Sequence, residues 1–345
     1  MKTAVLVCPG RGTYNKAELG YLRQHFPDPI LLAEFDAVRI SAGQDTVTAL
    51  DSAARFSASR FGRGDNASAL IYAATLGDFL SIDQSKIKIV AVTGNSMGWY
   101  SALSCAGAMT PLAGFELANT MGTLMQEALI GGQLIYPFAG NDWRPNPERK
   151  AKLLALVSEI DAQPDHALAL SIDLGGMLVL AGNEAGLKSF EEAVPRIQDR
   201  FPMRMDNHAA FHTKLQSRVA ELARARIGAT CFDHPQLPLI DGRGAIWWPG
   251  SSDARNLRDY TLGHQVTQSY NFTRAVIIAA REFAPDIFIV TGPGAIFGGA
   301  VAQSLILANW RGMGNKTDFR DLQARAPVLV SMGVKTQRPS VTDCE

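Results

Sequence analysis

Short runs of Val, Ile and Leu alternate with longer stretches of helical periodicity through much of the chain. The apolar runs, several of which end in or near glycine turns, lie at Thr3–Val7, Ile87–Val92, Leu237–Ile240 and Asp286–Val290. Most are followed by residues whose apolar positions recur at helical spacing, which is typical of βα units around a mostly parallel sheet. The pattern therefore predicts an α/β fold.

The middle of the chain follows a different pattern. Strand-like runs surround two helical stretches there: the strands at Gln133–Phe138, His166–Ile172, Met177–Ala181 and Phe201–Met205, the helices at Pro147–Ile160 and Glu184–Arg200. We predict a small inserted α+β subdomain over 129–203 and a larger core built from 1–128 and 204–320. Residues 321–345 are expected to form a C-terminal tail that is poorly ordered from Lys335 onward.

Composition and charge exclude several classes of protein. The chain has 33 basic and 33 acidic residues, so it lacks the basic excess of a nucleic-acid-binding protein. No window approaches the roughly 18 consecutive apolar residues of a membrane span, and the first apolar run is too short for a signal peptide. We therefore expect a cytoplasmic protein with no membrane or nucleic-acid partner.

The cysteines do not form a recognisable framework. They are widely separated, without a C-x-x-C pair, at Cys8, Cys105, Cys231 and Cys344. This spacing indicates neither disulfides nor a structural metal, and we expect reduced thiols that lie mostly in the core.

The strongest chemical signal is a G-x-S-x-G motif at Gly94–Gly98, with Ser96 at its centre. It follows the predicted strand Ile87–Val92 and precedes a helical stretch, which is the context of a nucleophile elbow. The glycines suit a tight, strained turn, and the N–H of Met97 would face an oxyanion at the positive end of the helix. The alternative is a strand–turn–helix that contains two glycines by chance. The strand before the motif and the helix after it favour a nucleophile.

A serine nucleophile needs a base, and His212 is the first candidate among six histidines. It stands just after a predicted strand and before a predicted helix, where sites are often built. His208 and His264 are weaker candidates. From spacing alone, a purely structural role for His212 stays equally open.

Several motifs together resemble the malonyl-CoA:acyl carrier protein transacylases and the acyltransferase domains of polyketide synthases. The matching segments, in chain order, are Pro9–Gly12, Gly94–Gly98, Ser171–Gly182, Ala210–Thr213 and Gly292–Gly294. Each motif alone is weak, but their order and spacing are specific. The resemblance covers nearly the whole chain up to about Ala308.

The resemblance implies a hydrolase-like α/β core with a ferredoxin-like insert and a ping-pong acyl transfer in fatty acid or polyketide biosynthesis. Ser96 would take an acyl group from coenzyme A, and the thiol of an acyl carrier protein would receive it, with His212 as base. The N–H groups of Arg11 and Met97 would form the oxyanion hole. A backbone carbonyl near Asn271 would orient the histidine. No cofactor or metal is implied beyond the coenzyme A thioester, and the oligomeric state stays open.

Three departures from the family concern the acyl group. The family's carboxylate-binding arginine, in an R-G-x-x-M-Q context, is replaced by Met121. A buried carboxylate that loses such a charge partner is destabilised by roughly 3–5 kcal/mol. Asn95 occupies the position before the serine where the family usually has histidine. Arg11 occupies the opening-loop position where the family usually has glutamine. We interpret the Arg11 side chain as a solvated loop arginine, the alternative being that it replaces the missing charge. We expect an acyl pocket with Met121, Asn95 and Phe211, and a non-carboxylated acyl group such as acetyl or a longer chain.

Other functions compete with acyl transfer. An editing thioesterase would use the same Ser96–His212 pair, and a silent scaffold would bind carrier protein without reacting. An ordinary α/β-hydrolase is disfavoured because no histidine follows the last core strand, Asp286–Val290. The Gly292–Gly294 turn lacks the Lys-Ser/Thr ending of a phosphate loop.

Overall fold

The computed structural model describes residues 1–343. Its large sheet has the strand order β11-β10-β1-β2-β7-β8. The strands are β1 (Lys2–Cys8), β2 (Ile87–Gly94), β7 (Leu239–Ile240), β8 (Ile246–Trp247), β10 (Ile287–Val290) and β11 (Leu329–Ser331). All neighbours pair in parallel except β7 with β8. The predicted α/β fold is confirmed.

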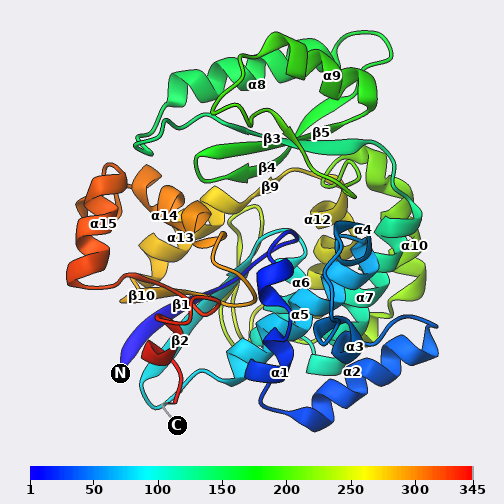
Figure 1. Cartoon of the computed structure of the whole chain (residues 1–345), viewed down its shortest axis with the longest axis vertical. Coiled ribbons are helices and arrows are strands. Elements are labelled where there is room, and N and C mark those ends of the chain that lie inside the picture. The colour runs from blue at the N-terminus through cyan, green and yellow to red at the C-terminus, as the bar shows by residue number, and fades with distance from the viewer. Residues whose placement is uncertain (344–345) are drawn as a thin grey trace.

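Helices cover both faces of the large sheet (Figure 1). One group contains α5 (Gly64–Leu80), α6 (Gly98–Cys105) and α7 (Pro111–Glu127), and the other contains α13 (Phe272–Phe283), α14 (Gly298–Leu307) and α15 (Lys316–Arg325). The central strands β1 and β10 are buried along almost their whole length, as expected for a parallel sheet enclosed by helices.

Further helices complete the larger part. They are α1 (Tyr21–His25), α2 (Pro29–Ser41), α3 (Val47–Asp51), α4 (Ala58–Phe61), α10 (Ser217–Arg226), α11 (Ala254–Asp259) and α12 (Gln265–Thr267). A π-helical turn, Tyr260–His264, joins α11 to α12. No helix of residues 1–343 is both long and apolar enough to cross a membrane.

The second part is a smaller sheet whose outer face carries α8 (Pro147–Asp161) and α9 (Glu184–Ala193), drawn in green in Figure 1. Its order is β6-β3-β5-β4-β9, from β3 (Gly132–Pro137), β4 (Leu168–Leu174), β5 (Met177–Gly182), β6 (Met203–Arg204) and β9 (Tyr270–Asn271). The run β3-α8-β4-β5-α9-β6 is the βαββαβ order of a ferredoxin-like unit.

Strand alternation gives the small sheet two different apolar faces. Leu134, Tyr136, Leu178 and Leu180 pack with residues of α8 and α9 in a separate core. The opposite face carries Ile135, Ile172 and Val179, which pack toward the large part of the molecule and line a cavity together with Ser96 at the end of β2.

The C-terminal segment 321–343 packs against the large part of the molecule. It supplies β11 to the large sheet, and Val341 beyond it is buried. Tertiary packing therefore orders a stretch whose polar composition led us to expect a tail. Cys344 and Glu345 of that predicted tail lie outside the described residues.

Candidate active site

The turn between β2 and α6 holds Ser96 in the left-handed region, with φ of +54°. Its two glycines are required by close backbone contacts. A Cβ at Gly94 would lie 2.3 Å from the Gly98 carbonyl oxygen, and one at Gly98 would lie 2.2 Å from that of Cys8. The strained turn therefore presents the Ser96 hydroxyl at the carboxyl ends of β2 and β1, as a nucleophile elbow does.

Ser96 and His212 are brought together although they are far apart in sequence. Ser96 Oγ lies 2.8 Å from His212 Nε2, and His212 Nδ1 lies 2.6 Å from the Gln265 carbonyl oxygen. Because a carbonyl only accepts, Nδ1 carries the proton and Nε2 is free to accept the one from Ser96. Burial lowers the pKa of His212 to about 4, so the ring is a neutral base at pH 7.

Gln265, rather than a residue at 271, orients the histidine. It begins α12 directly after the π-helical turn, and its side chain also donates to the Ser96 carbonyl at 3.0 Å. Asn271 instead caps α13, where its Oδ1 accepts from the N–H of Arg274 at 2.8 Å. The expectation at Asn271 is wrong because the π turn brings the carbonyl six positions earlier to the imidazole.

Two backbone N–H groups flank Ser96 without a partner. Within residues 1–343, the N–H groups of Arg11 and Met97 donate to no protein acceptor. The loop that carries Arg11 lies against the elbow, since a Cβ at Gly10 would be 2.8 Å from the Asn95 carbonyl oxygen. Met97 precedes α6, whose N-terminal end is electropositive. Both groups are therefore available for an oxyanion.

Two cavities meet at Ser96. The larger, about 400 Å³, lies between the small sheet and the core, and its wall includes Ile135, Ile172 and Val179 from the inner sheet face. The smaller, about 20 Å³, extends inward past His212 toward α5 and α7. A void of this size holds little more than one water-sized group.

The predicted acyl-pocket residues separate into two sets. Asn95 and Phe211 line the larger cavity, and Phe211 also lines the smaller one. Met121 is fully buried and lines neither of them. On α7 the lining residues are Gly122 and Met125, so the expectation at Met121 is wrong. Its side chain belongs to the apolar core behind the pocket wall.

The Arg11 side chain is half-buried and bonded to the protein rather than fully solvated, contrary to our interpretation of the sequence. Its Nη2 donates to the carbonyl oxygens of Gly62 at 2.6 Å and Asn207 at 3.0 Å, and the guanidinium lies 5.5 Å from the Phe211 ring centre. Burial lowers its pKa to about 10, which leaves it charged at pH 7. The loop folds inward because these carbonyls and the aromatic face offer contacts that spacing alone does not reveal.

A chain of hydrogen-bonded side chains, of which Gln133 and Ser171 are buried, supports the histidine loop, and this role was missed in the sequence. His208 Nδ1 lies 2.7 Å from Gln133 Oε1, and Gln133 Nε2 donates to Ser171 Oγ at 2.6 Å. Ser171 in turn donates to the Phe211 carbonyl at 2.8 Å. The small sheet thereby fixes the backbone directly before His212, which itself has φ of +57°. No local motif marks these residues.

The described residues contain no group of three or more His, Cys, Asp or Glu side chains placed to hold a metal ion. Of the weaker histidine candidates, His208 lines the larger cavity. His264 stacks on Tyr260 with ring centres 5.6 Å apart.

Comparison with solved structures identifies the fold. The chain aligns with the acyl-carrier-protein S-malonyltransferase of Burkholderia pseudomallei at a TM-score of 0.74, with 19% identity and 99% of each chain covered. The malonyl-CoA:acyl carrier protein transacylase of Synechocystis gives 0.75 at 16% identity, covering 99% of this chain and 100% of that one. An acyltransferase domain of the salinomycin polyketide synthase gives 0.69 at 18%, covering 99% and 71%.

Sequence comparison points to the same proteins. The malonyl CoA-acyl carrier protein transacylase of Salmonella typhimurium is 23% identical over 211 residues, or 60% of this chain and 63% of its own length. The non-reducing polyketide synthase CTB1 of Cercospora nicotianae is 26% identical over 216 residues, or 61% of this chain and 9% of its own length. No family model matches the chain.

The chain is thus an α/β protein with a serine elbow facing a buried histidine. Its fold is that of the malonyl-CoA:acyl carrier protein transacylases and polyketide synthase acyltransferases, and the resemblance drawn from its motifs is confirmed.

Proposed function

We propose that the protein transfers an acyl group from coenzyme A to an acyl carrier protein through an ester of Ser96. The observation that carries the proposal is the 2.8 Å contact between Ser96 Oγ and the neutral Nε2 of His212. A serine hydroxyl is a weak nucleophile until a base within this distance accepts its proton. The comparisons name acyl carrier protein as the partner of the relatives.

In the first half-reaction, Ser96 Oγ attacks the thioester carbonyl while its proton passes to His212 Nε2. The N–H groups of Arg11 and Met97 hold the oxyanion. Loss of one such donor typically costs about 3–4 kcal/mol of transition-state stabilisation. The carbon–sulfur bond then breaks, and the leaving thiolate takes the proton from His212, which leaves the Ser96 ester and coenzyme A.

In the second half-reaction, the phosphopantetheine thiol of the carrier protein gives its proton to His212 and attacks the ester. The carbon–oxygen bond breaks, the proton returns to Ser96 Oγ, and the acyl group leaves on the carrier. The larger cavity, which is largely apolar and opens at Ser96, suits the passage of a pantetheine arm.

The acyl group that is transferred depends on the walls around Ser96. The expectation of a neutral acyl group rested on Met121 and on a solvated Arg11. The α7 residues that line the smaller cavity, Gly122 and Met125, carry no charge, but Arg11 lines the same cavity and brings a positive charge to it. The acyl preference therefore turns on Arg11.

The test is intact-protein mass spectrometry after incubation with malonyl-, acetyl- and longer acyl-CoA, with and without carrier protein. We expect an adduct on the wild type, none on Ser96→Ala, and transfer to the carrier thiol. Release of free acid without transfer would favour the editing thioesterase. Absence of any adduct, together with no reaction with a serine-directed phosphonate, would favour the silent scaffold.

A further inference from the structure

The hydrogen-bonded chain behind the histidine loop fixes the proton on the His208 ring. The Phe211 carbonyl only accepts, so the Ser171 hydroxyl, 2.8 Å away, gives it its single proton. Ser171 Oγ must then accept from Gln133, which places the Gln133 amide nitrogen on that side at 2.6 Å and its Oε1 toward His208. Because Oε1 only accepts, His208 Nδ1, which lies 2.7 Å from it, carries the proton.

The other ring nitrogen of His208 is an acceptor that the protein leaves open. Burial and the positive charge of Arg11 hold the pKa of His208 well below its usual range, so the ring is neutral at pH 7 and Nε2 has a free lone pair. Within residues 1–343, Nε2 makes no hydrogen bond. The side chain is half-buried, and Nε2 is not among the enclosed polar atoms without a partner. A bound molecule can therefore reach it.

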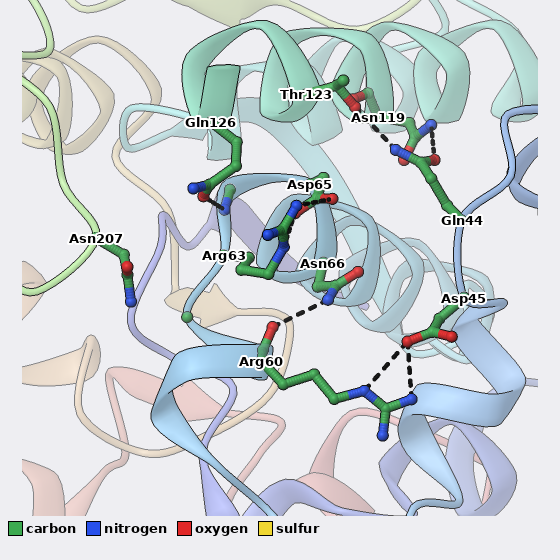
Figure 2. Close-up of polar contacts among 12 residues, drawn as sticks. Gln44, Asp45, Arg60, Arg63, Asp65, Asn66, Asn119, Thr123, Gln126 and Asn207 are labelled. Atoms are coloured by element: carbon green, nitrogen blue, oxygen red, sulfur yellow. Dashed lines mark hydrogen bonds and ion pairs between the residues drawn. The ribbon is translucent and has the colours of Figure 1, made fainter. Parts of the chain in front are cut away.

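His208 stands where two cavities meet. It lines the larger cavity at Ser96 and a second one of about 150 Å³ beside α4, and Arg11 also lines both. Arg11 Nη2 donates to the carbonyl oxygens of Gly62 and Asn207, which anchors the residue directly before His208. Figure 2 shows Asn207 beside the segment that precedes α5. The imidazole is thus held at the wall of the cavity that contains Ser96.

An amide that enters the larger cavity needs such an acceptor. The wall formed by the small sheet is apolar, with Ile135, Ile172 and Val179. The pantetheine arm shared by coenzyme A and the carrier protein contains two secondary amides. An amide N–H that leaves water without gaining a new partner is strongly disfavoured.

We propose that His208 Nε2 accepts a hydrogen bond from an amide N–H of the pantetheine arm and so positions the sulfur end of that arm at Ser96. This inference rests on the proposed acyl transfer. Because both substrates carry the same arm, His208 would act in both half-reactions. No bond forms or breaks at His208, so its role is to bind and position the arm.

Two substitutions separate the roles of the two ring nitrogens. In His208→Asn the side-chain amide reaches the position of Nδ1 and can still donate to Gln133, but nothing reaches the position of Nε2. In His208→Gln the amide oxygen reaches the position of Nε2, and the bond to Gln133 is lost.

The experiment compares second-order rates of Ser96 acylation by an acyl-CoA and by the p-nitrophenyl ester of the same acyl group, which has no pantetheine arm. We expect His208→Asn to lower the ratio of thioester to ester rates about 10-fold, as expected for one lost hydrogen bond. His208→Gln should keep the ratio closer to that of the wild type.

His166→Asn is the matched control. His166 Nδ1 also faces an acceptor, the Pro164 carbonyl at 2.7 Å, but this histidine lines neither cavity and its substitution should keep the wild-type ratio. An unchanged ratio in His208→Asn, or equal losses with both substrates, would overturn the inference, because a histidine that only supports the loop affects both substrates alike. A loss confined to hydroxyacyl-CoA would overturn it by assigning the acceptor to an acyl hydroxyl. These results leave the acyl transfer standing, whereas no acylation by any thioester would overturn the proposed function itself.

Discussion

At the scale of single residues, the reacting pair could be predicted and its support could not. Ser96 lies in a motif whose two glycines are required, because a Cβ at either one would lie 2.2–2.3 Å from a backbone oxygen. The spacing of the glycines therefore defines the turn. His212 was one of several candidates until the fold placed it 2.8 Å from Ser96. The group that orients it is the backbone carbonyl of Gln265. Every residue has a backbone carbonyl, so the sequence does not show which one accepts this hydrogen bond.

The environment of His212 gives a prediction for pH dependence. The base must be neutral to accept the Ser96 proton, and burial lowers its pKa to about 4. A lowered pKa keeps the neutral form present at lower pH, so Ser96 acylation should stay constant from about pH 8 to pH 6 and fall as pH approaches 4. An ordinary histidine would lose activity near pH 6.5. Rapid-mixing mass spectrometry measures the profile.

The control for this profile is circular dichroism at each pH, which separates protonation of the base from unfolding. A midpoint near 6.5 in a folded protein would show that His212 is more exposed to solvent than its position in the structure indicates.

At the scale of elements, strands and helices with clear periodicity were predicted within a few residues. The helix expected over Glu184–Arg200 is the main difference, since α9 ends at Ala193. Pro195 explains this, because the residue before a proline avoids helical geometry. The strand β9 was missed, since two residues of a core segment join the small sheet only through tertiary pairing with β4.

Two buried serines test the hydrogen-bond chain between β3, β4 and the histidine loop. Ser171 links Gln133 to the Phe211 carbonyl, so Ser171→Ala should leave both groups unpaired and lower the free energy of unfolding by about 1–3 kcal/mol. Ser101 on α6 is equally buried but its Oγ has no partner, so Ser101→Ala should be neutral or stabilising. Urea denaturation measures both. Equal effects of the two substitutions would argue against the chain.

At the scale of the whole molecule, the two-part architecture followed from the change of periodicity, whereas the role of the C-terminus did not. Periodicity describes a strand or helix locally, but the segment 321–343 is ordered by contacts with residues far away in sequence. Arg338 pairs with Asp78 of α5, whose Oδ2 also accepts from Tyr21 at 2.8 Å and from the Gly292 N–H at 2.8 Å. This cluster joins the C-terminal segment to α1, α5 and the turn after β10.

Loss of Arg338 should therefore destabilise the whole fold. Asp78 is fully buried, and breaking a buried ion pair by removing one partner costs about 3–5 kcal/mol, so Arg338→Met should lower the free energy of unfolding by that amount at pH 8. Burial already raises the pKa of Asp78 to about 6 while Arg338 lowers it, so removal of the arginine should raise it further. A protonated Asp78 has no charge to bury, and the loss of stability should shrink as pH falls toward 5.

Urea unfolding at both pH values measures this, and Asp78→Asn combined with Arg338→Met should recover part of the loss at pH 8. A loss that is equal at the two pH values would mean that packing, rather than the ion pair, holds the C-terminal segment in place.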